Sequence, residues 1–376
     1  MRLMVGSLAA ISLIAAPGAG LAQRPGELIS AEPVTSQLAN SQAWKITYWT
    51  SNERGPARQA TAMVVTPLGG RPGGQVRPVL AWTHGVWGVA SKCAPSLSAN
   101  FWRWSAGLQG VARGYTVVAP DYPGLGSPGI HPLLIGRPTA RSVLDAVRAA
   151  GQVPGANAGK RFAVWGESQG GHAALWTAQI AHNYAPDLTL VGAAASAPAT
   201  YLLDNLKNGS DPSARTFLTA YALHSWSEYY GAPLSSVAGP QSRGIITRLS
   251  QNNCINFEAK PKLGTILGVL TLGRSLRGVD LAKVEPWGGY GRDNSVKPAQ
   301  IEVPLLISQN AADKIVAPAV TRRFAHDACA AHKRVRWIDI QGKGHETSAS
   351  DTAGVTLDWI GARFAGTPAP NNCGKF

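Results

Sequence analysis

The chain has 376 residues, of which 45% are apolar and 15% are charged, and its formal net charge at pH 7 is +14. This composition is typical of one large or two ordinary globular domains and excludes a disordered chain. The Lys and Arg residues are scattered, and the chain has no zinc-finger, RRM or helix-turn-helix signature. The basic balance therefore indicates a solvated basic surface and no nucleic-acid partner.

The first 22 residues have the pattern of a secretory signal peptide. Arg2 supplies the positive start, an apolar stretch runs from Leu3 to Ala16, and small residues lead up to Ala22. The apolar stretch is too short to span a bilayer. We therefore expect a signal that is cleaved near Ala22 and a secreted or periplasmic protein, with an uncleaved anchor as the alternative.

Strand and helix patterns then alternate along the first half of the chain. A Pro-, Gly- and Ser-rich start is expected to lie along the surface. The predicted strands are Trp44–Trp49, Gln59–Thr66, Val79–Thr83, Tyr115–Pro120, Arg161–Trp165 and Leu188–Ala195. Helices are expected from about Asn100 to Arg113, from near Arg141 to Ala150 and from Gly171 to Ile180. This alternation predicts an α/β fold, with a mostly parallel sheet and helices on both faces.

The alternation stops near Thr200 and resumes only at Val303. Two further strands are predicted there, Val303–Ser308 and Arg334–Ile340, each followed by a helix. Because the sheet resumes, we interpret the intervening segment as an inserted, mainly helical cap, although we identify no long apolar helix in it. The predicted division is a core of residues 23–199 and 299–376 and a cap of residues 200–298, with a separate domain as the alternative.

The pentapeptide Gly166-Glu167-Ser168-Gln169-Gly170 lies between a predicted strand and a predicted helix. A G-x-S-x-G sequence in this setting is typical of the nucleophile elbow of α/β-hydrolases. The flanking residues must be small because the backbone passes close to itself. With 42 glycines in the chain, an isolated match could also be a Gly-rich connection. The strand and the helix around the pentapeptide favour Ser168 as a nucleophile.

A serine nucleophile needs a base, and the base needs an acid that holds its tautomer. In this fold the chain order is Ser, acid, His, with the acid after the next-to-last strand and the histidine after the last. Asp313 and His345 occupy these positions, with glycines beside His345. Asp339 is a weaker candidate because it lies inside a strand. His172, on the helix after the elbow, is expected to pack or to support a loop; the remaining histidines that we considered are His182, His224, His326 and His332.

The developing oxyanion of an acyl-transfer reaction needs two hydrogen-bond donors. The residue after the nucleophile, Gln169, supplies one through its backbone N–H. For the second donor the sequence offers two candidates: Gly85, in the loop after the Val79–Thr83 strand, and Asp121, directly after the Tyr115–Pro120 strand.

The chain has four cysteines, Cys93, Cys254, Cys329 and Cys373. In an exported protein an even number favours two disulfides, and four cysteines allow three pairings. None of them are spaced as C-x-x-C, which argues against a zinc site, and we expect no metal.

In order along the chain, several motifs resemble the secretory lipase family, the lipase-A-like branch of the α/β-hydrolases. They are Thr83–Ala90, Cys93–Ser96, Asp121–Gly126, His131-Pro132, Gly166–Trp176, Ser196–Ala199 and Asp313–Pro318. The resemblance covers about Glu32 to Cys373. It implies an acyl-ester hydrolase without a cofactor, an oxyanion hole at Asp121 and Gln169, and the disulfides Cys93–Cys254 and Cys329–Cys373.

The sequence therefore predicts a secreted serine hydrolase of the lipase or carboxylesterase type. Ser168 attacks the ester, His345 moves the proton, and Asp313 orients His345. An acyltransferase, a peptidase and a polyester- or aromatic-ester hydrolase would use the same site, and a non-catalytic binding protein is the alternative of a different class. We expect a monomer that acts on a small-molecule or lipid ester and makes transient contact with a lipid interface.

Overall fold

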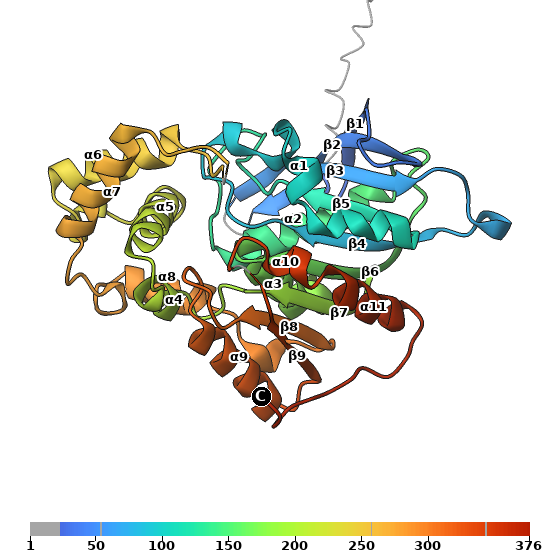
Figure 1. Cartoon of the computed structure of the whole chain (residues 1–376). Helices are drawn as coiled ribbons and strands as arrows, with labels where there is room; N and C mark the ends of the chain where they lie inside the picture. The colour runs from blue at the N-terminus through green and yellow to red at the C-terminus, as the bar shows by residue number, and fades with distance from the viewer. Residues whose placement is uncertain (1–22, 53–54, 257, 343) are drawn as a thin grey trace, which may run out of the picture.

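The computed structural model describes residues 23–52, 55–256, 258–342 and 344–376, which are organised around one nine-stranded sheet (Figure 1). The predicted signal peptide lies outside the described residues. The strands are β1 (Leu28–Val34), β2 (Ser41–Asn52), β3 (Gly55–Pro67), β4 (Arg77–Thr83), β5 (Thr116–Pro120), β6 (Ala158–Glu167), β7 (Thr189–Ser196), β8 (Leu305–Asn310) and β9 (Val335–Ile340).

The strand order is β1-β2-β3-β5-β4-β6-β7-β8-β9. The pairs from β1 to β5 are antiparallel, and those from β5 through β4 to β9 are parallel. The predicted mostly parallel sheet is thus confirmed. The segment expected to lie along the surface does so, but Leu28–Val34 also forms an edge strand on β2 that the sequence did not predict. Its side chains are half-buried or exposed, so no continuous apolar run marks it in the sequence.

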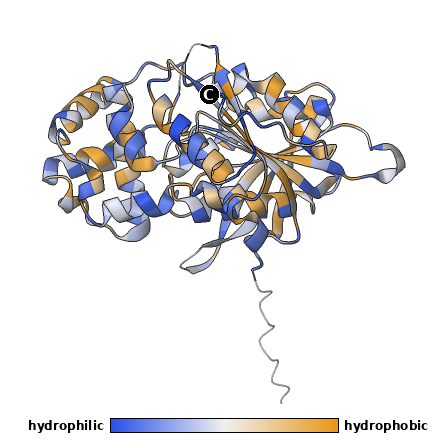
Figure 2. Cartoon of the chain, turned by 90° about the horizontal axis from the view of Figure 1, so that it is seen from below, coloured by the Kyte–Doolittle hydropathy of each residue, from blue (hydrophilic) through white to orange (hydrophobic). Residues whose placement is uncertain are grey.

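Helices cover both faces of the sheet. On one face α2 (Gly136–Ala150), α3 (Gln169–Tyr184) and α9 (Pro318–Ala330) pack into one apolar cluster with the sheet. On the other face lie α1 (Phe101–Trp104), the 3₁₀ helix η4 (Ala106–Arg113), α10 (Ser348–Asp351) and α11 (Ala353–Phe364). The strands between these layers are largely hydrophobic, whereas the helices combine both kinds of residue (Figure 2).

One predicted helix is broken in two, because the stretch from Asn100 to Arg113 forms α1 and η4. Glycines explain the change: a Cβ on Gly107 would lie 2.7 Å from the Trp82 side chain. The backbone therefore approaches the sheet more closely than a residue with a side chain allows, and glycine disfavours a regular α-helix.

Between β7 and β8 the chain forms a helical group to one side of the sheet (left in Figure 1). Its helices are α4 (Leu202–Asn208), α5 (Pro212–Tyr230), α6 (Pro240–Asn252), α7 (Leu263–Ser275) and α8 (Trp287–Asn294). They have their own apolar cluster around Tyr221, Trp226 and Trp287. No long apolar helix was expected in this segment; α7 is apolar but has 13 residues, and its glycines lower its intrinsic helix propensity.

Among the described residues, no helix combines the length and the apolar character that crossing a membrane requires.

Candidate active site

Ser168 lies on a strained turn between β6 and α3. Its φ and ψ are 59° and −119°, a region that side-chain-bearing residues rarely adopt. The flanking glycines have no space for a side chain: a Cβ would lie 2.0 Å from Thr83 Oγ1 at Gly166 and 1.9 Å from the Thr83 carbonyl oxygen at Gly170. The backbone N–H of Ser168 donates to the Ser196 carbonyl at 2.9 Å. These contacts hold the turn at the carboxyl end of β6, where its residues meet a cavity.

Asp313 and His345 come from the loops after β8 and β9 and form a direct hydrogen bond. His345 Nδ1 lies 2.7 Å from Asp313 Oδ2, and the two residues are 7% and 4% exposed. The other carboxylate oxygen, Oδ1, accepts from the backbone N–H groups of Ile315 at 2.8 Å and Val316 at 3.0 Å. Gln309 Nε2 also donates to Oδ2 at 3.0 Å. Asp313 is therefore fixed from several sides and holds the imidazole by one nitrogen.

The pKa shifts of Asp313 and His345 favour His345 as a proton acceptor. Burial raises the pKa of Asp313, but the hydrogen bond and charge of His345, with the two backbone donors, bring it below its usual value. Burial lowers the pKa of His345, but the hydrogen bond and charge of Asp313 raise it above its usual value. Asp313 thus stays ionised at neutral pH, and protonation of His345 is favoured.

A cavity of about 1690 Å³ opens at this point and is lined by both Ser168 and His345. Its walls are mainly apolar and come from two parts of the molecule. The core side includes Trp82, Trp87 and Trp102, and the helical group contributes Phe217, Ile266 and Leu270. The predicted nucleophile and base are therefore brought to one cavity that an apolar substrate portion would fill.

The oxyanion candidates have different surroundings. Gln169 begins α3, where a backbone N–H has no partner within the helix. Gly85 lines the cavity, and a Cβ on it would lie 3.6 Å from Ser168 Cβ. Asp121 is 1% exposed, and its backbone N–H donates to the Thr61 carbonyl at 2.8 Å. Its carboxyl group accepts from Thr61 Oγ1 at 2.6 Å and from Ser96 N at 2.9 Å.

Asp121 is not among the residues that line the cavity, whereas Gly85 is. Since the backbone donor of Asp121 is already paired, these contacts favour Gly85 over Asp121 as the second donor. Asp121 instead ties the loop after β5 to β3 and to Ser96. Burial raises its pKa to about 6, although its bonds to Ser96 and Thr61 act in the opposite direction.

The competing residues have structural partners. His172 Nε2 lies 2.8 Å from the Asn294 carbonyl, and burial lowers the pKa of His172 to about 4. It therefore links α3 to the end of α8, in line with the expected supporting role. Asp339 accepts from Arg322 at 3.0 Å and from Trp337 Nε1 at 2.9 Å. These bonds place Asp339 in an exposed ion pair on β9.

The sequence predicts no role for the buried side chains around Tyr122. His84 and His131 both contact its ring, and His131 Nε2 lies 3.1 Å from Gln169 Nε2. Burial lowers the pKa of His84 to about 4 and that of His131 to about 3, so both are neutral supports. Their proximity depends on two loops, those after β4 and β5, and on the start of α3, and no local pattern reveals it.

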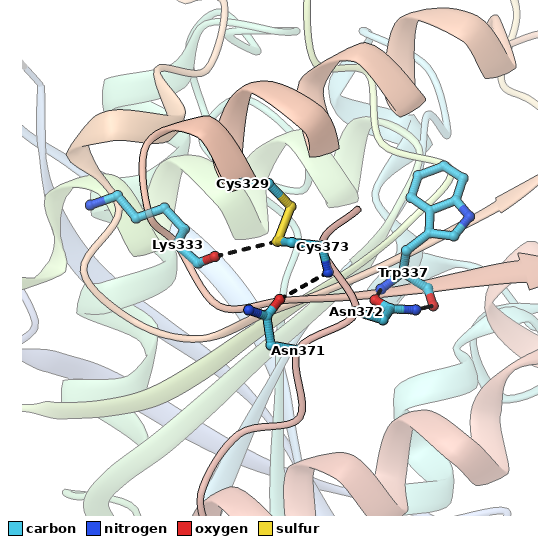
Figure 3. The surroundings of a disulfide bond; sticks show 6 residues. All are labelled: Cys329, Lys333, Trp337, Asn371, Asn372 and Cys373. Carbon is cyan, nitrogen blue, oxygen red and sulfur yellow. Dashed lines mark hydrogen bonds between the residues drawn. A yellow bond between two sulfur atoms is a disulfide. The ribbon is translucent and has the colours of Figure 1, made fainter. Parts of the chain in front are cut away.

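The four cysteines form two disulfides, Cys93–Cys254 and Cys329–Cys373, the same pairs that the resemblance implies. The first joins the loop after β4 to the segment between α6 and α7. The second fixes the C-terminal segment to the end of α9 (Figure 3). Beside it, Asn372 exchanges two hydrogen bonds with the backbone of Trp337, which attaches this segment to β9. Within the described ranges there is no group of three His, Cys, Asp or Glu side chains that would hold a metal ion.

Comparison with known proteins identifies a family to which part of the chain is similar. The model of the secretory lipase family matches residues 108–250. Over this range the chain is similar to the secretory lipase family. The matched family and the fold are those of lipases and esterases, which supports a carboxylic ester hydrolase.

Among proteins of similar sequence, a probable inactive lipase of Mycobacterium tuberculosis is 26% identical, covering 94% of this chain and 80% of the relative. Lipase 4 of Candida albicans is also 26% identical, covering 69% of this chain and 58% of its own length. Candida antarctica lipase A in its closed state has a TM-score of 0.74 at 20% identity, covering 94% of this chain and 85% of that one. The rice cell wall degrading esterase LipA of Xanthomonas oryzae has a TM-score of 0.62 at 18% identity, covering 91% and 97%. The predicted α/β-hydrolase fold is thus confirmed.

Proposed function

We propose that this protein hydrolyses carboxylic esters through Ser168, His345 and Asp313 by way of an acyl-enzyme. The observation that carries the proposal is the buried 2.7 Å contact between Asp313 and His345 beside a cavity that Ser168 also lines. Gln309 and two backbone N–H groups hold Asp313, so the imidazole is oriented before substrate arrives. This preorganisation is what a triad base requires.

In the proposed reaction, His345 Nε2 takes the proton of Ser168 as the hydroxyl oxygen attacks the ester carbonyl. Asp313 keeps the proton of His345 on Nδ1 and stabilises the imidazolium. The backbone N–H groups of Gln169 and Gly85 bind the oxyanion. His345 then gives its proton to the leaving alcohol, and water repeats the sequence on the acyl-enzyme to release the acid.

The test is Ser168→Ala, measured with a short p-nitrophenyl ester. Hydrolysis should fall to background while the circular dichroism spectrum is unchanged. Ser235→Ala, an exposed serine in the helical group, is the matched control and should keep full activity. Activity retained by the Ser168 variant would reject the assignment.

The cavity supports an ester with a large apolar part. Its volume of about 1690 Å³ exceeds the few hundred to about 1,000 Å³ of ordinary ligand pockets, and its walls are rich in tryptophan and aliphatic side chains. Because residues of α5 and α7 line it together with Ser168, we infer that the helical group of residues 200–298 is a cap over the site. In a chain-length series of esters, kcat/KM should rise from acetate towards longer acyl groups; a maximum at acetate would contradict this inference.

The exposed face of α7 supports transient contact with a lipid interface. Leu263 is 72% exposed and Leu267 is 55% exposed, and Leu270 on the same helix also lines the cavity. Lys260 and Lys262 lie exposed just before the helix. Apolar side chains of this kind beside basic ones fit the surface of a lipid aggregate. Activity should therefore rise when the same ester is emulsified, and an equal rate on soluble and emulsified substrate would argue for a plain esterase.

A catalytically inactive member of the family is the second candidate, because one relative is described as a probable inactive lipase. Labelling with a fluorophosphonate probe separates the two. The proposed enzyme should be labelled at Ser168, whereas an inactive scaffold should not be. Product analysis with an added alcohol then distinguishes hydrolysis from acyl transfer.

A further inference from the structure

The acidic side chain before the nucleophile has no part in the triad. Glu167 ends β6, and its half-buried side chain lines the same cavity as Ser168 and His345. Burial raises the pKa of this carboxyl group, and the backbone N–H of Ala349 in α10 is among the groups that lower it. The helix α10 follows His345 in the chain, and its first N–H, from Ser348, donates to the His345 carbonyl at 3.2 Å.

One carboxylate oxygen of Glu167 is not paired. Oε1 is buried and has no hydrogen-bond partner among the described residues. An unpaired, buried carboxylate oxygen is costly unless a positive charge compensates for it. The positive charge of protonated His345 stabilises the ionised form of Glu167.

The two groups affect each other's ionisation. Burial raises the pKa of Glu167 to about 7, the charge of His345 lowers it, and Glu346 and Asp313 raise it. Burial lowers the pKa of His345, whereas Asp313, Glu167 and Glu346 raise it. His84, in the loop after β4, is neutral near pH 7 because burial lowers its pKa to about 4. The electrostatic coupling therefore joins His345 to three carboxyl groups, of which Glu167 and Glu346 line the cavity together with it.

We propose that Glu167 is a positioning residue for His345: its carboxylate lies at the cavity that Ser168 and His345 also line, and it stabilises the protonated ring that forms when Ser168 attacks. The inference rests on the proposed function. Glu167 transfers no proton in it and forms no bond to the substrate. Its charge shares the stabilisation of the imidazolium with Asp313, and its own protonation removes that share as the pH falls.

The test compares Glu167→Gln with the parent enzyme from pH 5 to 9 on a short soluble ester. Glutamine has nearly the same size and shape as glutamate but carries no charge, so the fold should be preserved. The protonated form of His345 is then less stable. The acid limb of kcat/KM should move to lower pH by about half a unit to one unit, and the plateau should fall by about two- to tenfold. An unchanged limb would overturn the proposal.

Two further variants separate charge from shape. Glu167→Asp keeps the charge and should return the limb towards the parent position; if it behaves like the glutamine variant, the charge is not responsible and the proposal fails. Glu346→Gln removes an exposed carboxylate next to His345. It should move the limb by less than Glu167→Gln, because solvent screens its charge. A larger movement with Glu346→Gln would also overturn the proposal.

An NMR titration makes the inference independent of turnover. In a Ser168→Ala background labelled with ¹⁵N-histidine, the pKa of His345 should fall when Glu167→Gln is added. Equal values in the two proteins overturn the inference, whatever the activity. A lowered value in a protein whose parent shows no esterase activity supports the coupling and rejects the proposed function instead.

Discussion

Replacing Asp313 by asparagine tests the proposed mechanism with the least disturbance of the fold. The amide oxygen takes the place of Oδ1 and keeps the backbone donors Ile315 and Val316. The amide nitrogen takes the place of Oδ2, towards which His345 Nδ1 and Gln309 Nε2 both point. The contacts with His345 and Gln309 then each place one hydrogen-bond donor against another.

The Gln309 side chain can avoid this contact between two donors. Its Oε1 has no hydrogen-bond partner among the described residues, so its side chain can turn and accept from the amide N–H introduced by the substitution. His345 can pair with the new amide only as the tautomer that carries its proton on Nε2. That nitrogen can then no longer accept the proton of Ser168. We expect kcat to fall by about 10³- to 10⁴-fold, which corresponds to about 4–5.5 kcal/mol of transition-state stabilisation.

The assay is steady-state hydrolysis of a short p-nitrophenyl ester by the variant, with thermal unfolding to show that the fold is kept. Asp339→Asn is the matched control. Asp339 bonds only to Arg322 and Trp337 among the contacts described for it and is more than half exposed, so its replacement should leave kcat within about twofold. If Asp313→Asn kept more than a tenth of the parent kcat, or if Asp339→Asn lost as much, the assignment of the acid would be refuted.

Three further predictions concern other parts of the molecule. Since Asp313 raises the pKa of His345 above 6.5 and the base must be neutral, kcat/KM should rise with pH to a midpoint above 6.5; a midpoint at lower pH would contradict the pairing. Cys329→Ser combined with Cys373→Ser opens a loop with a sequence separation of 44, which costs about 4 kcal/mol by the loop-entropy argument, so the melting temperature should fall by several degrees while activity at 25 °C persists. Leu267→Asp on the exposed face of α7 should lower the rate on an emulsion by about tenfold and leave the rate on a soluble ester unchanged; equal losses on both would mean that α7 acts within the cavity instead.

The fold was largely predictable because a parallel sheet has buried strands. Each of the predicted strands corresponds to an observed one, with ends that differ by a few residues, because continuous apolar runs such as Val79–Thr83 are visible without knowledge of their neighbours. The edge strand β1 lacks such a run. The broken helix at α1 and η4 depends on how closely Gly107 approaches Trp82, which is a tertiary contact.

The positions of Ser168, Asp313 and His345 in the chain follow from topology. The carboxyl ends of parallel strands meet at one edge of the sheet, so residues after β6, β8 and β9 are brought together whatever the loops contain. The choice between Gly85 and Asp121 has a different basis. It turns on whether one backbone N–H is already paired with Thr61, and a sequence pattern carries no such information.

The same distinction explains why the sequence assigned no role to Glu167. Within the elbow, a Cβ on Gly166 or Gly170 would lie about 2 Å from neighbouring atoms. Only glycine fits at these positions, so the two glycines indicate the turn. The position of Glu167 has no such constraint, and many residues would satisfy the motif there. Yet the turn that carries Ser168 also leaves the preceding side chain at the cavity, which His345 lines as well. The glycines therefore predict the nucleophile, while in our proposal the unconstrained residue beside it adjusts the electrostatic environment of the base.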